Sequence, residues 1–317
     1  MSEGERGMEF CLSIEIQEGM TYADTLAMTR AGEAAGFHAA LLAEHYYASS
    51  GRPELMSADA WIFLGALARE TTRIRLGTLV SPVTFRHPSV LAKLAASLDH
   101  VSAGRAELGI GAGWLPDEHK AYGFPFPAGP RRVDLLEEQL QIITGLWGQE
   151  PFSFSGAHYR LEECRFTPRP VQERLPIIVG GDAGATRLPR LAARYADEYV
   201  IGRGSVALCR EVRERLDRDC ERAERDPAAV SLALFAGLCV AETEEEVARL
   251  LARMMEGARP HMQDTSTWIL GTPEQAAARL RELSAAGVGR LMFSVDSDLH
   301  REMVPLLGER VKPLMEA

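Results

Sequence analysis

Apolar and polar positions follow two periods along this chain, and the stretch from Arg73 to Trp114 shows both of them. Residues Arg73–Val80 form a short run rich in β-branched and apolar side chains, which predicts a strand that is ended by Ser81-Pro82. From Pro88 onward, apolar residues recur every three or four positions, which predicts a helix. A second apolar run, Ala106–Ile110, predicts another strand. A strand, a helix and a strand in this order form a unit whose two strands run parallel.

The same alternation of strand-like and helix-like segments extends over the rest of the chain. The eight predicted strands are Glu9–Ile16, Ala39–Ala43, Arg73–Val80, Ala106–Ile110, Pro176–Val179, Glu198–Ile201, Val230–Val240 and Arg290–Val295. This count predicts a (β/α)8 TIM barrel, and we expect residues 1–317 to form a single domain of this kind. A doubly wound open sheet is the alternative. Against it, no Gly-x-Gly-x-x-Gly motif follows the first strand, and no shift in composition marks a domain boundary.

Two segments interrupt the alternation after the fourth predicted strand. Residues 114–130 are rich in proline and glycine, and we expect an irregular excursion there. Residues 149–175 have no helical period, and aromatic residues near Phe152 and Tyr159 suggest a hairpin. This second segment is too aromatic for a solvated spacer, so it is interpreted as an insertion. A later stretch, Gly257–Leu270, favours neither a strand nor a helix.

Charge and composition exclude several classes of protein. A formal net charge of −10 argues against binding to nucleic acid, which needs a basic surface, and disfavours an anionic membrane surface. No apolar run approaches the ~20 residues that a membrane-spanning helix needs. The first residues do not have the pattern of a secretory signal. The five cysteines are scattered and contain no C-x-x-C motif, which is typical of a reduced, cytoplasmic protein.

Residues that could take part in catalysis or binding follow several predicted strands. In folds with parallel strands, active sites lie at these strand ends. His45 follows the second strand and is a candidate proton shuttle, with a loop histidine that only bonds backbone as the alternative. Its neighbour Glu44 should point to the opposite face, and we expect it to be structural and paired with an arginine. Gly180, Gly181 and Gly184 precede a predicted helix, and they indicate either a phosphate cradle or only a tight turn. The histidines have no metal-ligand spacing, so no metal site is expected.

Four stretches of the sequence carry a family resemblance: LLAEHYY, the long stretch from Arg73 to Trp114, EHKAYGFPF and PIIVGG. Through them the chain resembles the luciferase-like monooxygenase superfamily, most closely its branch of coenzyme F420-dependent oxidoreductases. The resemblance is strong over residues 9–202 and weaker over residues 268–296. It implies a (β/α)8 barrel with an insertion after the fourth strand, in agreement with the strand count.

The resemblance also implies roles for individual residues. His45 would be the general acid or base near the reactive ring of a flavin-type cofactor. The implied cofactor-binding residues are Leu79, Val80, Ser81, Ala112, Gly113, Trp114, Gly180, Gly181 and Arg203. Among these, Leu79 and Val80 would share a non-prolyl cis peptide behind the ring, Gly180 and Gly181 would hold a phosphate, and Arg203 would bind an anionic group of cofactor or substrate.

Two reactions are compatible with the resemblance. With coenzyme F420, which we favour, the protein would transfer a hydride between the deazaflavin and a small organic substrate. With reduced FMN supplied by a separate reductase, it would oxygenate a substrate with O2. A non-catalytic flavin-binding or partner subunit is a third alternative. Trp114 stands where a related deazaflavin dehydrogenase has a glutamate, so the proton-transfer role of that glutamate does not carry over. The lysines with which that enzyme binds a sugar phosphate have no counterpart here, so we expect no sugar-phosphate substrate. The resemblance further implies a homodimer.

Overall fold

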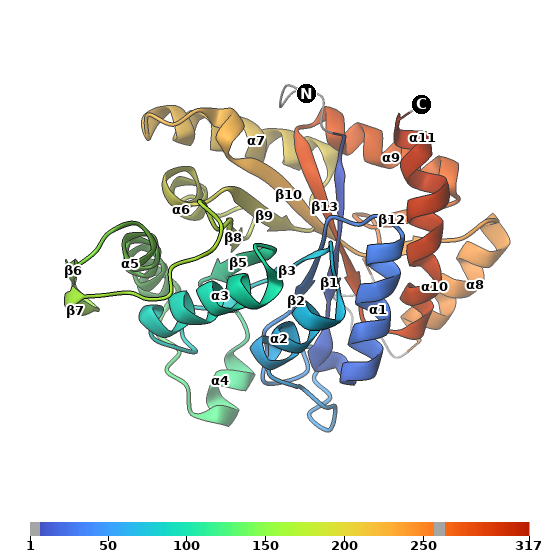
Figure 1. Ribbon diagram of the computed structural model, residues 1–317. Coiled ribbons are helices and arrows are strands. Elements are labelled where there is room, and N and C mark those ends of the chain that lie inside the picture. The colour runs from blue at the N-terminus through green and yellow to red at the C-terminus, as the bar shows by residue number, and fades with distance from the viewer. Residues whose placement is uncertain (1–6, 257–263, 317) are drawn as a thin grey trace.

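The computed structural model describes residues 7–256 and 264–316, and its centre is a closed barrel of parallel strands (Figure 1). The barrel strands are β1 (Glu9–Ile14), β2 (Ala39–Leu42), β3 (Arg75–Thr78), β5 (Ala106–Gly111), β8 (Ile177–Gly181), β9 (Glu198–Gly202), β10 (Ser231–Ala236) and β13 (Val288–Val295). The sheet closes on itself because β3 pairs with β5 as well as with β2. The predicted (β/α)8 barrel is therefore confirmed, and the open-sheet alternative is wrong.

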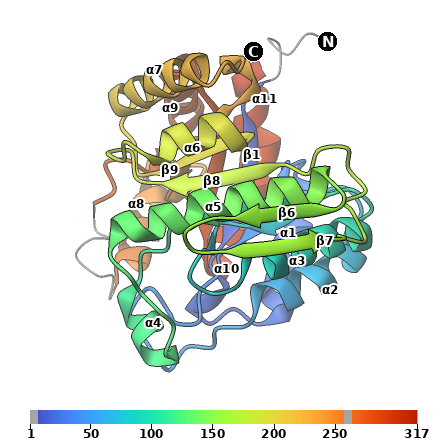
Figure 2. The ribbon, with the colours of Figure 1, turned by 90° about the vertical axis from the view of Figure 1, so that its left-hand side faces the viewer.

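Helices surround the barrel and cover the outer face of its strands (Figures 1 and 2). They are α1 (Tyr22–Ala34), α2 (Ala60–Glu70), α3 (Pro88–Ser102), α4 (Pro116–Tyr122), α5 (Gly129–Gly148), α6 (Leu188–Tyr195), α7 (Val206–Arg222), α8 (Glu244–Met255), α9 (Pro273–Ala285), α10 (Asp298–Leu306) and α11 (Lys312–Glu316). Polar residues start several of them: the Asp59 carboxylate, for example, accepts a hydrogen bond from the backbone N–H of Ile62 at 3.0 Å. None of the helices described here is long and apolar enough to cross a membrane.

Successive side chains along each strand point to opposite faces of the sheet, so the apolar core has two parts. Side chains that point into the barrel form one cluster, composed of Cys11, Ala39, Leu41, Ile178, Val200, Ala233 and Met292. Their sequence neighbours, such as Leu12 and Ala40, belong to the larger cluster between the strands and the helices. Both layers are buried, so the strands are apolar on both faces, as parallel barrel strands usually are.

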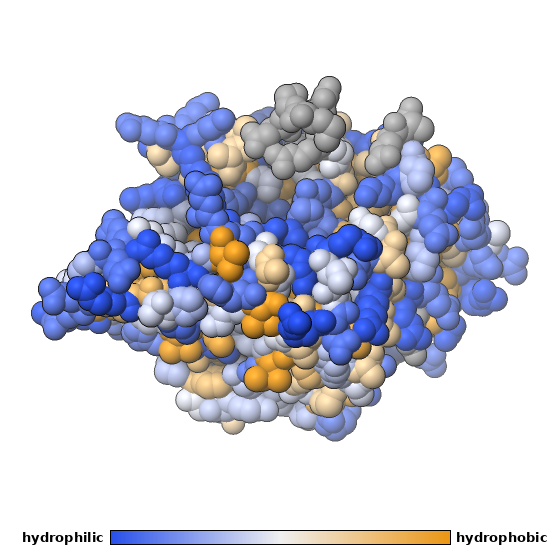
Figure 3. Space-filling view, in the orientation of Figure 1, coloured by the Kyte–Doolittle hydropathy of each residue, from blue (hydrophilic) through white to orange (hydrophobic). Residues whose placement is uncertain are grey.

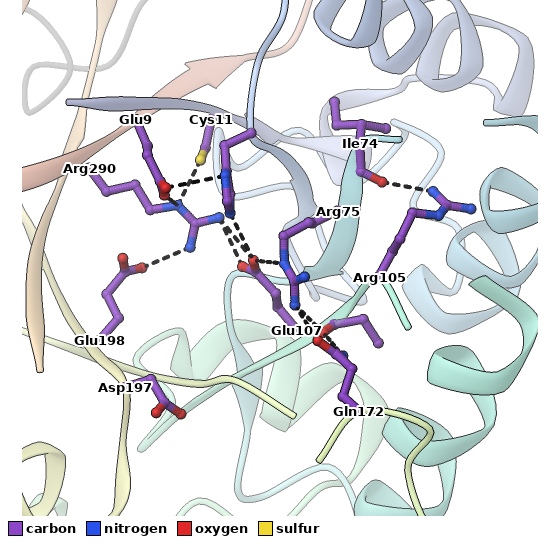
Figure 4. Close-up of polar contacts among 12 residues, drawn as sticks. Glu9, Cys11, Ile74, Arg75, Arg105, Glu107, Gln172, Asp197, Glu198 and Arg290 are labelled. Carbon is purple, nitrogen blue, oxygen red and sulfur yellow. Dashed lines mark hydrogen bonds and ion pairs between the residues drawn. The ribbon is translucent and has the colours of Figure 1, made fainter. Parts of the chain in front are cut away.

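A buried ionic cluster occupies the barrel at the amino-terminal ends of its strands (Figure 4). Arg290 on β13 contacts Glu107 on β5 at 2.9 Å and Glu198 on β9 at 3.3 Å, and its Nε donates to Cys11 Sγ at 2.8 Å. Arg75 on β3 contacts the same Glu107 at 2.6 Å. Burial acts to raise the pKa of Glu107, but the charge of Arg290, a hydrogen bond from His38 and the charge of Arg75 outweigh it and hold this pKa well below its usual range. The cluster thus closes the barrel end opposite to the predicted active site.

The third predicted strand, Arg73–Val80, differs from the structure near its carboxyl end. Strand β3 ends at Thr78, and the peptide between Leu79 and Val80 is cis. Ser81 and Pro82, expected to break the strand, form the short strand β4 (Ser81–Pro82), which pairs with β5. At this bulge the Val80 side chain lies against Gly111, and a Cβ added at Gly111 would come within 2.7 Å of it. A glycine on the neighbouring strand therefore leaves room for a bulge that no local pattern reveals.

The seventh predicted strand, Val230–Val240, is two strands in the structure. After β10 the chain leaves the barrel, and β11 (Leu238–Val240) pairs in parallel with β12 (Ile269–Gly271). The two strands separate at Gly237, which lies under the indole of Trp268; an added Cβ would come within 2.3 Å of that ring. The prediction of one continuous strand was wrong because the residue that covers Gly237 is remote in the sequence.

The two segments after the fourth barrel strand, β5, also have defined structure. Residues 114–130 were expected to be irregular but contain the helix α4, so that expectation was wrong. Residues 149–175 contain the expected hairpin, in which β6 (Phe152–Ser155) pairs antiparallel with β7 (Arg160–Cys164) on the outside of the molecule (Figure 2). The ambiguous stretch Gly257–Leu270 begins outside the described residues and ends in β12.

Candidate active site

The carboxyl ends of the barrel strands surround a cavity of about 500 Å³, a size typical of small-molecule sites. Most of its lining is apolar or glycine. Its titratable lining residues are Glu15 after β1, His45 after β2 and Asp182 after β8. Within the described part of the chain, no lysine or arginine lines this cavity. The cavity lies where the loops of a parallel barrel carry chemistry.

Most of the predicted cofactor-binding residues meet at this cavity together with His45. Those that line it are Leu79, Val80, Ala112, Gly113, Trp114, Gly180 and Gly181. Ser81 and Arg203 are not part of the lining. The Ser81 side chain is buried and donates its hydroxyl hydrogen to Glu44. Arg203 follows β9 in a left-handed conformation with φ of 54°, and its backbone N–H donates to the Phe235 carbonyl at 3.2 Å.

One wall of the cavity consists of Val80 lying against glycine positions of two neighbouring strands. An added Cβ would lie 2.7 Å from Val80 Cγ2 at Gly111 and 3.0 Å from Val80 Cγ1 at Gly180. Any larger residue at these positions would displace the valine from the barrel mouth. The result is an apolar surface formed by Val80 and glycine backbone, and a flat aromatic ring system can lie on such a surface.

The loop after β8 is closed by its own hydrogen bonds. The Gly184 backbone N–H donates to the Asp182 carboxylate at 2.8 Å, so this amide is occupied within the loop. The Tyr199 hydroxyl, buried under the loop, donates to the Asp182 carbonyl at 3.0 Å. An added Cβ at Gly181 would lie 2.6 Å from that hydroxyl, so the turn requires glycine there. Because Asp182 occupies the Gly184 amide, the loop has the hydrogen bonding of a tight turn, and its use as a phosphate cradle stays a prediction.

His45 is held at the cavity by a carboxylate from α4. Its Nδ1 lies 3.0 and 3.1 Å from the two carboxylate oxygens of Glu118, which is fully buried. Glu118 Oε2 also accepts the backbone N–H of Tyr46 at 3.0 Å. The Trp114 ring packs edge-on against the imidazole, with ring centroids 5.6 Å apart. Because Nδ1 is bonded to Glu118, Nε2 is the ring nitrogen that a ligand in the cavity can reach.

The electrostatics of the site favour a protonated imidazole and a neutral carboxyl. Burial acts to lower the pKa of His45, but the hydrogen bond and the charge of Glu118, with other nearby carboxylates, outweigh it and raise this pKa above 6.5. Burial raises the pKa of Glu15, although the Gln17 amide and the Ser13 hydroxyl each donate to its carboxylate at 2.9 Å. Both pKa shifts favour the protonated form, which is the imidazolium for His45 and the neutral acid for Glu15.

Glu44, the sequence neighbour of His45, is turned away from the cavity. It forms an ion pair with Arg86, as the sequence analysis expected, and accepts hydrogen bonds from Ser81 and from the Trp61 indole N–H at 3.2 Å. Its side chain is almost fully buried. Glu44 therefore ties the start of α2 to the bulge after β3 and has no direct contact with a ligand in the cavity.

Helix α4 is fixed to the barrel mouth by aromatic and polar contacts. The Tyr46 ring lies 4.9 Å from that of Phe85 and 5.1 Å from that of Phe124, centroid to centroid. His119 Nε2 lies 2.6 Å from the Thr84 hydroxyl. These contacts join α4 to the loops after β2 and β4, which border the cavity. They therefore determine where Glu118 meets His45.

Sequence reasoning missed Glu15, Glu118 and Asp182 as residues of the site. The predicted first strand extends to Ile16, whereas β1 ends at Ile14, and a 3-10 turn follows that places Glu15 at the cavity. Glu118 lies 73 positions from His45, and no local pattern relates the two. The available signals for α4 are Pro116 at its start and Gly123 after its end, which together mark a short helix.

Comparisons with known proteins identify relatives over most of the chain. The family model described as luciferase-like monooxygenase matches residues 8–290. An uncharacterized protein of Mycobacterium tuberculosis is 38% identical over 146 residues, which are 46% of this chain and 50% of that protein. The chain thus spans about half the length of this relative. An F420-dependent glucose-6-phosphate dehydrogenase of Microbacterium testaceum is 35% identical over 147 residues, 46% of this chain and 43% of that protein.

Other similar proteins match over nearly the whole chain. An FMNH2-dependent dimethylsulfone monooxygenase of Pseudomonas fluorescens is 27% identical over 332 aligned positions, covering 94% of this chain and 87% of that protein. The structure of an F420-dependent secondary alcohol dehydrogenase superimposes with a TM-score of 0.83, covering 98% of this chain and 99% of that one. At 18% identity, this last likeness shows a shared fold.

Proposed function

This chain belongs to the luciferase-like monooxygenase family, and from that premise we propose that it transfers a hydride between coenzyme F420 and a small organic substrate. One observation carries the proposal: His45, bonded to Glu118, lines the same cavity as the apolar surface that Val80 forms with its glycine neighbours. A proton-transfer group beside a surface for a flat ring is the arrangement that hydride transfer to a carbonyl or imine requires. The F420-dependent relative, 35% identical over 147 residues, supports this cofactor.

The residues present fit a deazaflavin with a phosphate-bearing tail. Leu79, Val80 and the backbone of Gly113 would hold the ring, and the backbone of Gly180 and Gly181 would meet the phosphate. When bound, the deazaflavin would accept or donate the hydride. The protein would bind the substrate, transfer the proton and exclude water.

His45 performs the proton transfer in this proposal. Its raised pKa favours the protonated imidazole, so Nε2 can donate a proton to the substrate heteroatom during reduction and remove it during oxidation. Trp114 and Phe235 line the cavity with apolar surface and exclude water from the reacting carbon.

The charge of the lining restricts the substrate. Asp182 faces the cavity, no lysine or arginine from the described residues accompanies it, and the protonated His45 is already paired with Glu118. An anionic substrate would find no unpaired cation among these lining residues, so we expect an uncharged substrate.

The second candidate function is oxygenation of a substrate with FMNH2 and O2. The observation that favours it is the dimethylsulfone monooxygenase relative, whose alignment covers 94% of this chain. The same cavity would hold the flavin, and a separate reductase would supply it in reduced form.

Titration of the purified protein with coenzyme F420 and, separately, with oxidised FMN distinguishes the two candidates. We expect F420 to bind with a change in absorbance and quenching of fluorescence; binding of FMN alone would refute the F420 proposal. Ala112→Trp fills the cavity and should abolish binding of either cofactor. Ala157→Trp, at an exposed site near the hairpin turn, should leave it unchanged.

We also propose that the partner of this chain is a second copy of itself. Ile62 on α2 is 73% exposed, and Val90 and Val101 on α3 are 51% and 40% exposed. Figure 3 shows hydrophobic side chains on this face of the molecule, over the neighbouring helices α2 and α3. An apolar area shared by two packed helices is typical of a subunit interface.

A further inference from the structure

Glu118 is a fully buried carboxylate whose negative charge needs a counter-charge. Its hydrogen-bond partners within the described residues are the His45 ring and the backbone N–H of Tyr46. His119 Nδ1 lies 4.0 Å away but is bonded to the Leu115 carbonyl at 2.7 Å. No lysine or arginine among the described residues forms an ion pair with Glu118. A buried carboxylate without a cationic partner is strongly unfavourable, so the positive charge must reside on His45.

The other charged groups around His45 do not take the place of Glu118. Glu44 is on the opposite face of the chain and is neutralised by Arg86. Glu15 faces the cavity, but its carboxylate is bonded to side chains of its own segment, and burial raises its pKa. Glu118 is therefore the carboxylate that contacts the imidazole directly, at 3.0 Å.

We propose that Glu118 is a positioning residue that orients the His45 ring, holds the proton on Nδ1 and thereby presents protonated Nε2 to a substrate in the cavity. This inference rests on the proposed function for the substrate step, but the ion pair itself forms in the protein without any cofactor. In the reductive direction a bound reduced deazaflavin would supply the hydride to the substrate carbon, and His45 Nε2 would supply the proton to the substrate heteroatom. His45 becomes neutral, and solvent restores its proton after product leaves.

The role of Glu118 also explains why α4 is needed at the barrel mouth. The helix is short, and its anchors are the contacts of His119 with Thr84 and of Tyr46 with Phe124. These contacts hold the carboxylate against the loop that carries His45. Residues 114–130 would thus act on the reaction through the imidazole rather than through contact with the reacting atoms.

NMR titration of the cofactor-free protein tests the proposal. The protein is labelled with 13C and 15N in histidine, and His45→Gln identifies the His45 signal among the eight histidines. We expect the wild-type His45 to titrate above 6.5, with 15N shifts that show a proton on Nδ1 throughout. In Glu118→Gln the pKa of His45 should fall by roughly one to two pH units, as expected for loss of a charge-assisted hydrogen bond.

Matched variants separate this role from a purely structural one. Asp117→Asn removes an exposed carboxylate from the same helix and should leave the His45 titration unchanged. Glu118→Asp keeps the charge and should restore part of the raised pKa, which a purely structural role would not predict. An unchanged His45 titration in folded Glu118→Gln would overturn the proposal. If that variant does not fold, a wild-type His45 pKa at or below 6.5 would overturn it equally.

A kinetic measurement extends the test to the reaction. With the cofactor that binds, the basic limb of the pH profile of kcat/KM for substrate reduction should move to lower pH in Glu118→Gln, in the same direction as the NMR titration. If neither cofactor binds, the proposed function fails, whereas the NMR result still decides the role of Glu118. An NMR shift without any movement of the pH profile would refute the link between Glu118 and the proton that reaches the substrate.

Discussion

Replacement of Arg290 by methionine should destabilise the barrel, because it removes the cation at the centre of the buried ionic cluster. Arg290 is 5% exposed and contacts three carboxylates, Glu107 at 2.9 Å, Glu198 at 3.3 Å and Glu9 at 3.8 Å. Removing one partner of a buried ion pair typically costs about 3–5 kcal/mol. Glu107 keeps its contact with Arg75 at 2.6 Å, so the loss should be near the lower limit, about 3 kcal/mol.

The assay is thermal unfolding followed by circular dichroism at a series of pH values. With an unfolding entropy of about 2.1 cal/mol/K per residue, 3 kcal/mol corresponds to a fall in Tm of roughly 4–5 °C for this chain. The folded-state pKa of Glu107 lies below its ordinary 4.5. The contribution of ionised Glu107 to the free energy of unfolding is therefore complete above pH 4.5 and is lost as the pH falls. The difference between Arg290→Met and wild type should therefore be largest near pH 7 and shrink below pH 4.5.

Two further variants make the reasoning refutable. Arg290→Met combined with Glu198→Gln should regain part of the lost stability, because the carboxylate left without its cation becomes neutral. Arg160→Met removes an exposed arginine paired with exposed Glu162 and should change stability by no more than about 1 kcal/mol. Equal Tm values for Arg290→Met and wild type at pH 7, or a loss that does not vary with pH, would show that the cluster does not stabilise the barrel in this way.

Three more predictions concern the site and the surface. His45→Gln should lower kcat by roughly 10²–10⁴-fold, as expected for loss of a general acid, while fluorescence quenching shows cofactor affinity little changed; full turnover would exclude the proton-transfer role. Gly180→Val places a side chain 3.0 Å or less from Val80, so spectral titration should show loss of cofactor binding; retained affinity would mean that the ring lies elsewhere. Ile62→Glu should convert a dimer to a monomer in light scattering at unchanged Tm, whereas Val171→Glu, at another exposed apolar residue, should not.

The alternation of strand and helix periods was enough to predict the barrel. Parallel barrel strands are buried on both faces, so each appears as a short apolar run, and glycine, proline and polar residues separate the runs. The predicted Ala106–Ile110 and Glu198–Ile201 differ from β5 and β9 by one residue at the carboxyl end. The family resemblance added the cis peptide between Leu79 and Val80, which the structure contains.

The errors have a common cause, which is a contact between distant parts of the chain. The break between β10 and β11 depends on the Trp268 ring over Gly237, and the bulge after β3 depends on the space above Gly111. Helix α4 is too short to show a helical period, and contacts with Thr84 and Phe85 hold it in place. A local window of sequence contains none of these partners.

The sequence by itself therefore determined the barrel, the position of His45 after the second strand and the glycines that make room at the barrel mouth, since all of these follow from local periodicity and local backbone requirements. Only the tertiary structure decided which carboxylate meets which cation. Glu118 reaches His45 across 73 positions, and Arg290 reaches Cys11 across 279. A buried charge is stabilised by whatever group the closed barrel brings within about 3 Å, and that group has no fixed spacing along the chain.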